Sequence, residues 1–132
     1  MSAENVEMVR RGIEAFNRGD LDAALRGAHA GIEWHDQPEL PGATIHHGIE
    51  ATKEHLRSAL RDLPGYRVDA EELLDAEAHV VLCGRISARG RASDVPVERP
   101  YVATYTIEAG LMRCVRIFGN RAEALGAAGL SE

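Results

Sequence analysis

One carboxylate, Asp36, lies in a sequence context that suits acid or base chemistry. It ends the run 32–36, Ile-Glu-Trp-His-Asp, which is typical of a strand that leads into a proline-broken loop. Because side chains alternate along a strand, Asp36 shares a face with Ile32 and Trp34. An apolar pocket raises the pKa of a carboxyl group, and a carboxylate in such a pocket can remove a proton next to a carbonyl group. Asp36 is therefore the first candidate catalytic residue.

A base of this kind needs a partner that holds the enolate oxygen formed in the reaction. Tyr101 and Tyr105 share strand parity and carry hydroxyl groups, whereas His46 and His47 are adjacent and carry imidazoles. Neighbours on a strand point to opposite faces, so only one of the two histidines can line a pocket. We select as candidate catalytic residues Asp36, Tyr101 and His47. The candidate substrate-binding residues are Trp34, Tyr105, His46, Phe16, Leu56 and Arg116.

Structural roles compete with each of these assignments. Asp36 could cap the following turn or pair with an arginine, and Trp34 could be an ordinary core residue. The tyrosines could likewise be core residues whose hydroxyls reach a rim. His35 has the opposite parity to Asp36, so we expect it to face the helices or solvent.

A metal site needs three convergent ligands. His35, Asp36 and one histidine of the pair at 46–47 can be imagined in that role, but no spacing enforces it. We therefore predict no metal ion and no cofactor. His29 and His79 lie at the ends of predicted elements and His55 lies on a predicted helix, so we interpret all three as solvated or capping residues.

Helices are predicted in the first half of the chain. Apolar residues spaced three and four apart predict helices over 2–17, 21–28 and from Gly48 to Leu63, where Pro64-Gly65 follows. A strand begins at Ile32, and 43–47 is a short extended piece. The element that positions Asp36 is thus a strand between two helices.

In the second half of the chain, apolar and polar residues alternate with a period of two. Strands are predicted over 66–75, 79–89, 97–107 and 111–118, followed by a short helix over 121–126. Helices first and antiparallel strands afterwards indicate an α+β fold, in which three N-terminal helices cover the concave face of a strongly curved, cone-shaped sheet. Such a cone leaves a pocket at its open end.

Length and charge limit the function. A chain of 132 residues corresponds to a single domain over 1–132. The net charge of −6 repels phosphate backbones and anionic lipids, so nucleic acid and membranes are unfavourable partners. With no apolar run long enough to span a bilayer, we expect a cytoplasmic protein. Cys83 and Cys114 lack metal-ligand spacing, and we interpret both as reduced core residues.

Several runs of residues resemble a known family. They are Ala-Phe-Asn-Arg-Gly-Asp-Leu-Asp-Ala-Ala at 15–24, Ile-Glu-Trp-His-Asp at 32–36, Gly-Ile-Glu-Ala at 48–51 and Arg-Ala-Glu-Ala-Leu at 121–125. Together they are similar to the SnoaL-like branch of the nuclear transport factor 2-like superfamily. The resemblance implies a cone-shaped α+β domain with a deep apolar pocket. It also implies a homodimer packed through the outer sheet face.

The resemblance supports Asp36 more than its partners. Similar ketosteroid isomerases keep their proton-shuttling aspartate at the position of Asp36. Their two oxyanion-hole residues would fall near Gly12 and near Val102 or Ala103, so neither is present. The acid/base aspartate of similar polyketide cyclases also falls near Ala103, and their histidine becomes Tyr101. The charged network of limonene epoxide hydrolase-like enzymes is absent as well.

These observations favour a small-molecule pocket protein. The hypothesis is a cofactor-independent acid/base enzyme of the isomerase, cyclase or lyase type that acts on a hydrophobic cyclic or carbonyl-containing metabolite. The alternative is a non-catalytic ligand-binding or dimerising accessory domain, which the missing partner residues favour.

Overall fold

The protein combines four helices with one mixed sheet in the described part of the chain. The computed structural model describes residues 2–89 and 95–130. Its elements in chain order are α1 (Ser2–Asn17), α2 (Leu21–Ala24), β1 (Ala28–His35), β2 (Ile45–His47), α3 (Gly48–Asp62), β3 (Arg67–Ala76), β4 (His79–Arg89), β5 (Pro96–Glu108), β6 (Leu111–Phe118) and α4 (Arg121–Ala127).

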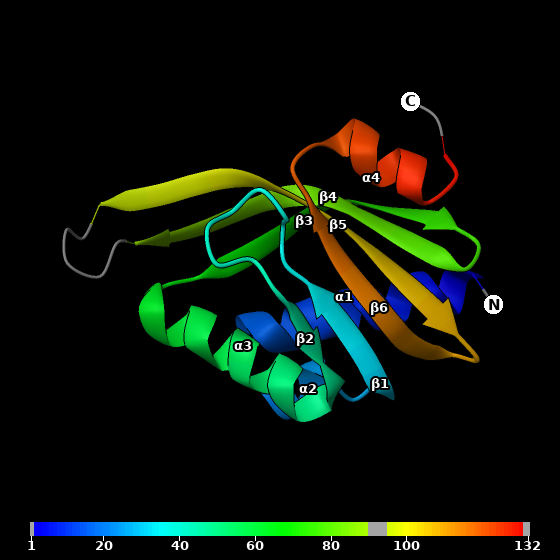
Figure 1. Ribbon diagram of the computed structural model, residues 1–132, viewed down its shortest axis with the longest axis horizontal. Coiled ribbons are helices and arrows are strands. Elements are labelled where there is room, and N and C mark those ends of the chain that lie inside the picture. Colours follow the sequence, from blue (N-terminus) through cyan, green and yellow to red (C-terminus); the bar gives the residue numbers. More distant parts are fainter. Residues whose placement is uncertain (1, 90–94, 131–132) are drawn as a thin grey trace.

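The sheet has the strand order β2-β1-β6-β5-β4-β3. Its first long strand, β1, pairs parallel with β6, whereas the other neighbours pair antiparallel. Helices α1, α2 and α3 cover one face of the sheet, and α4 lies on the other (Figure 1). The predicted α+β fold, with three N-terminal helices against a curved mixed sheet, is confirmed.

Two apolar clusters hold these layers together. The larger lies between the first three helices and the concave face, and includes Val9, Ile32 and Leu82 at no more than 1% exposure. The smaller lies under α4 and includes Val81 and Leu125. Because apolar burial is the main favourable term in folding, the larger cluster fixes how the helices sit over the sheet. None of the helices in the described residues has the length and apolar character needed to span a membrane.

The region between α2 and β1 differs from the prediction. The helix predicted over 21–28 ends at Ala24, and β1 starts at Ala28 rather than at Ile32. The physical reason is tertiary: Ala28 pairs with Met112 of β6, and the Met112 N–H donates to the carbonyl of Gly27 at 2.7 Å. Pairing with a strand far along the chain thus overrides a local helical pattern.

A bulge bends the sheet beside the cavity described below. The register between β3 and β4 shifts between Ala70 and Glu72, opposite Gly84. A bulge increases local bending and twist, which suits a sheet that must curve around helices. A Cβ atom on Gly84 would lie 2.0 Å from the Asp69 carbonyl oxygen, so only glycine fits there.

This close approach leads to a stability prediction. Replacing Gly84 by alanine forces the two backbones apart and should lower the free energy of unfolding by about 1–3 kcal/mol or more. Urea denaturation measures the change. The matched control is Gly126→Ala in α4, where an added Cβ meets no atom within 4 Å. Equal stability of the two variants would contradict the close contact at Gly84.

Candidate functional site

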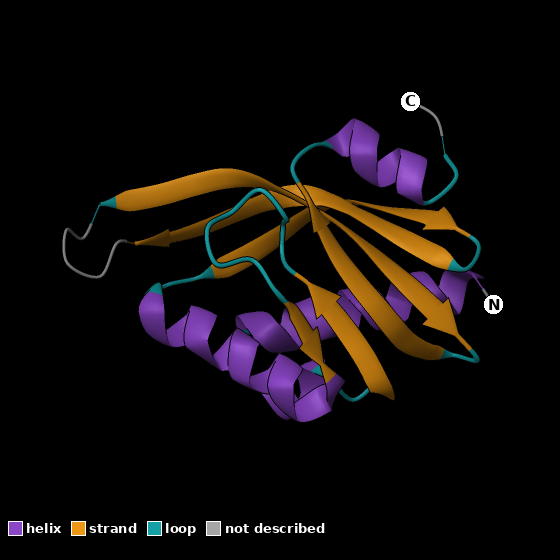
Figure 2. Cartoon of the chain, viewed as in Figure 1, coloured by secondary structure: helices purple, strands orange, loops and turns teal. Residues whose placement is uncertain are grey.

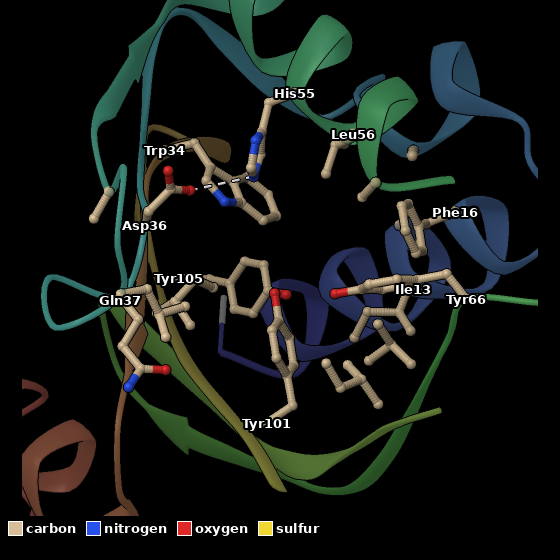
Figure 3. Close-up of a pocket in the computed structure, with 18 of the residues that line it drawn as sticks. Ile13, Phe16, Trp34, Asp36, Gln37, His55, Leu56, Tyr66, Tyr101 and Tyr105 are labelled. Carbon is tan, nitrogen blue, oxygen red and sulfur yellow. Dashed lines mark ion pairs between the residues drawn. The ribbon is translucent and has the colours of Figure 1, made fainter. Parts of the chain in front are cut away.

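A cavity of about 520 Å³ lies between the helices and the concave face of the sheet. Its walls are mainly apolar and come from α1, α3, the loop after β1 and strand β5 (Figure 3). The loop at 36–44 joins β1 to β2 and is drawn as a teal arch in Figure 2. A cavity of this size accommodates a compact ring-shaped molecule of small-ligand dimensions.

Asp36 lies at one side of this cavity, directly after β1. Its Oδ2 atom accepts a hydrogen bond from the Thr44 N–H at 3.2 Å and lies 3.1 Å from Nε2 of His46. Its Oδ1 atom lies 3.3 Å from Nε2 of His55. The Asp36 side chain is 19% exposed, so the carboxylate is largely shielded but still lines the cavity. Asp36 therefore closes the loop through Thr44 and also faces the cavity.

The two histidines that contact Asp36 stack on each other. Their ring centroids are 4.0 Å apart with an interplanar angle of 22°. Burial lowers the pKa of His55 below its ordinary value, and the neighbouring His46 lowers it further, whereas Asp36 acts in the opposite direction. His55 is consequently a neutral imidazole at neutral pH, able to donate from one ring nitrogen and accept at the other.

Three tyrosines form a further part of the polar lining, which also includes Gln37 and Arg99. All three tyrosines of the chain, Tyr66, Tyr101 and Tyr105, line the cavity, and their hydroxyl groups point toward its middle (Figure 3). Burial raises the pKa of each of them, so all are neutral hydrogen-bond donors at physiological pH. Within the described residues no protein group forms a hydrogen bond with these hydroxyls, which leaves them available to a ligand.

Most of the predicted site residues meet at this cavity. Asp36, Tyr101 and Tyr105 line it together with three apolar or aromatic residues, Trp34, Phe16 and Leu56. Trp34 is 9% exposed, and its ring centroid lies 6.0 Å from that of His55. His46 does not line the cavity, but its Nε2 atom contacts the Oδ2 atom of Asp36 and helps to hold that carboxylate in place.

Besides His46, two predicted residues do not line the cavity. In the ladder between β1 and β2, Trp34 faces His46 and Glu33 faces His47, so His47 takes the outer face of the sheet. Its side chain is 69% exposed and lies 3.7 Å from the Glu33 carboxylate. Arg116 also points outward, with its guanidinium 4.9 Å from the centre of the Phe118 ring. We therefore remove His47 and Arg116 from the candidate site.

His55 is the main residue that sequence reasoning missed. It was interpreted as a solvated helix residue, yet it lines the cavity and contacts Asp36. Its spacing from Thr52 and Ala59 is three and four residues, which is the spacing of one helix face. This spacing places His55 on the same helix face as the buried Thr52 and the cavity-lining Ala59, and it is the local signal that indicates an inward side chain. Tyr66 and Arg99 also line the cavity and were not selected.

Three N-terminal helices packed on a six-stranded mixed sheet, with an apolar cavity between the two layers, define the nuclear transport factor 2-like fold. Residues 9–115 match the SnoaL-like domain family, and the chain belongs to that family. The resemblance stated from the sequence is thus confirmed. The comparison with curated proteins found no match.

Solved structures share the fold at low sequence identity. A nuclear transport factor 2-like protein of unknown function from Burkholderia pseudomallei is 18% identical, with 93% of this chain and 95% of that chain covered and a TM-score of 0.79. TerC, co-crystallised with polyporic acid, is 20% identical, with 86% and 89% covered and a TM-score of 0.77. A protein with a ketosteroid isomerase-like fold from Catenulispora acidiphila, in complex with trimethylamine, is 14% identical, with 94% and 93% covered and a TM-score of 0.77.

The surroundings of His55 can be tested by titration. We expect NMR titration of its ring protons to give a pKa below the ordinary value of 6.5. The variant His46→Gln should raise this pKa because it removes the electrostatic effect of His46 that lowers it, and Asp36→Asn should lower it because it removes the carboxylate. Replacement of His29, at the opposite end of β1, serves as the control. A His55 pKa above the ordinary value, or shifts of the opposite sign, would contradict the described geometry.

Proposed function

We propose that this protein is a cofactor-independent acid/base enzyme that acts on a hydrophobic, ring-shaped, carbonyl-containing molecule. The observation that carries the proposal is that one apolar cavity holds both a carboxylate with a neutral histidine and a cluster of neutral tyrosine hydroxyls. The first group suits proton removal, and the second suits the stabilisation of an oxygen that gains negative charge.

The proposed reaction begins with proton abstraction next to the carbonyl group. The proton passes from carbon to a carboxylate oxygen of Asp36, and the electrons of the broken bond move through the new carbon–carbon double bond to the carbonyl oxygen. A hydroxyl of Tyr101 or Tyr105 donates a hydrogen bond to that oxygen. His55 holds the carboxylate in place while it gains and loses the proton. Return of the proton to another carbon completes an isomerisation. In a cyclisation, the enolate carbon instead attacks a second carbonyl carbon of the same molecule, and the oxygen of that carbonyl takes up the proton. In a lyase reaction, the enolate re-forms the carbonyl group while a leaving group departs from the β carbon with its electron pair and takes up the proton.

Neutrality of the tyrosines matters for this role. Their raised pKa values keep the hydroxyls protonated, so each can donate a hydrogen bond to an enolate. Preorganised donors in a cavity shielded from water act more strongly than the same donors in water. A positioned base contributes about 10²–10⁴ in rate and one oxyanion donor about 10²–10³. Together these two contributions correspond to about 10⁴–10⁷ in rate, which reaches the lower end of the accelerations typical of enzymes.

Solved structures of the same fold support the binding of small molecules. TerC was co-crystallised with polyporic acid, and the Catenulispora acidiphila protein was solved with trimethylamine. Both examples show small molecules with proteins of this fold. The aromatic wall formed by Trp34 suits stacking on a flat ring in this chain.

A second candidate function is ligand binding without turnover. It is favoured by the hydrogen bond from the Thr44 N–H to Asp36, which gives the carboxylate a purely structural role in closing the loop. In that case the cavity binds the same class of molecule, and the tyrosines select it through its oxygen atom.

We further propose a homodimer in the cytoplasm. Helix α4 covers the outer face over β4, β5 and the Phe118 end of β6, which leaves the outer face of β2, β1 and the rest of β6 for a second copy. Light scattering coupled to size-exclusion chromatography should give twice the chain mass of 14.3 kDa. A mass of one chain at micromolar concentration would contradict the dimer.

The enzymatic proposal is tested by hydrogen–deuterium exchange. In deuterated water, the protein should accelerate exchange of the protons next to the carbonyl of cyclic ketones such as indanone and α-tetralone, as followed by NMR. Asp36→Asn should reduce the acceleration by about a hundredfold or more, because it removes the base. Tyr101→Phe should reduce it by about tenfold or more, because it removes a donor.

The control variant is His79→Gln, because His79 bonds to Thr106 and does not line the cavity. Calorimetry of ketone binding separates chemistry from affinity. Tight ketone binding without accelerated exchange would favour the ligand-binding function. Exchange that is unchanged in Asp36→Asn would exclude Asp36 as the base.

A further inference from the structure

A second cluster of chemistry-bearing side chains lies on the opposite face of the sheet from the cavity. In the strand register, Glu33 of β1 pairs with His47 of β2 on one side and with Cys114 of β6 on the other. His35 lies two residues further along β1 and therefore on the same face as Glu33. We name these four residues, Glu33, His35, His47 and Cys114, the outer-face cluster.

The potential ligand atoms of this cluster lie close together. Nε2 of His35 is 3.1 Å from Oε1 of Glu33, and Nδ1 of His47 is 3.7 Å from Oε2 of Glu33. The ligand atoms of Glu33, His35 and Cys114 all lie within 4.8 Å of one another. These three side chains are half-buried, whereas the exposed His47 side chain has room to move toward them.

The electrostatics of the cluster suit a cation. The bond from His35 lowers the pKa of Glu33, which therefore carries its negative charge at neutral pH. Burial and the nearby Glu33 raise the pKa of the Cys114 thiol, so it is protonated in the absence of a metal. A bound metal ion deprotonates such a thiol and releases the proton to solvent.

Two arginines lie near the cluster but are engaged elsewhere. Arg113 donates a hydrogen bond to the carbonyl of Gly31, and the Arg116 guanidinium lies over the ring of Phe118. Their charges lower the pKa of the Cys114 thiol, which favours the thiolate that a metal needs. The two positive charges therefore repel a metal cation, but they also stabilise the Cys114 thiolate that would bind the metal.

We propose that the outer-face cluster binds one zinc ion. Two imidazole nitrogens, a carboxylate oxygen and a thiolate sulfur form the type of four-ligand set that holds Zn²⁺ in tetrahedral geometry. The ligands are Glu33, His35 and Cys114, with His47 as the fourth. This proposal is independent of the proposed enzymatic activity, and it replaces the sequence-based expectation that the protein binds no metal.

The inner group of Asp36, His46 and His55 is less suited to a metal. Its ligand atoms also lie within 4.8 Å of one another. However, the two imidazole rings stack nearly parallel, with 22° between their planes. The in-plane lone pairs of two parallel rings do not converge on one point about 2.0–2.1 Å from both nitrogens, as zinc requires.

Zinc at the outer-face cluster would link three strands. It would join the edge strand β2 to β1 and β6, at the place where the chain enters and leaves the loop 36–44. Asp36 follows His35 directly, and the loop contributes Gln37 and Leu40 to the cavity lining. The ion would thus fix both ends of the segment that carries Asp36.

The proposal is tested by metal titration of the full chain after treatment with a chelator. Calorimetry should show one equivalent of Zn²⁺ bound with proton release. Titration with Co²⁺ should produce the ultraviolet charge-transfer band of a cobalt–thiolate bond. Cys114→Ser should abolish that band, and both Cys114→Ser and His35→Gln should weaken zinc binding by about a hundredfold or more.

Two controls separate this site from other sources of binding. Cys83→Ser changes a cysteine that packs under α4, and His55→Gln changes the inner group. Both variants should retain the cobalt–thiolate band and the zinc affinity. No saturable zinc binding, binding that survives His35→Gln unchanged, or binding lost in His55→Gln but not in Cys114→Ser would overturn the proposal. His35→Gln provides the test if Cys114→Ser does not fold.

The outcome is distinguishable from that of the enzymatic proposal. Asp36→Asn should bind zinc like the unmodified chain, because Asp36 is not in the outer-face cluster. The isotope exchange described above is measured without added metal. Each proposal can therefore fail while the other holds.

Discussion

Strand β1 is hydrogen-bonded on both sides, to β2 and to β6, and this double pairing determines where the chemistry of the chain is placed. Because a strand paired on both edges cannot rotate, its alternation is fixed: Trp34 and Asp36 face the helices, and Glu33 and His35 face outward. A slip of one residue would exchange the two faces and turn Asp36 away from the cavity. The inner cavity and the outer-face cluster are therefore two consequences of one register.

The cavity gathers polar groups in apolar surroundings, which is unfavourable unless those groups find partners. Three tyrosine hydroxyls meet there, without a protein partner in the described residues. Asp36, by contrast, is held by Thr44, His46 and His55. The arrangement combines a preorganised carboxylate with donors reserved for a ligand, which is the pattern expected of a functional site rather than of a core.

Local sequence patterns predict most of the helices and strands, but they do not predict which way several site side chains point. The strand 79–89 was predicted with its observed bounds, because alternation and turn residues are local signals. The start of β1 differs from its predicted position, because it depends on parallel pairing with β6, whose residues are far away in the sequence. Which of His46 and His47 turns inward follows from pairing with β1, and sequence parity alone leaves that choice open. His55 reaches Asp36 only because α3 packs beside β1, so its role depends on tertiary structure.

The central claim is that the tyrosines hold a carbonyl oxygen while Asp36 faces the neighbouring carbon. A crystal structure of the protein with α-tetralone bound tests it most directly. The account predicts that the ketone oxygen lies about 2.6–3.2 Å from a hydroxyl of Tyr66, Tyr101 or Tyr105, with the adjacent carbon turned toward the Asp36 carboxylate. A ketone bound in the cavity with its oxygen away from all three hydroxyls, or bound outside the cavity, would contradict it.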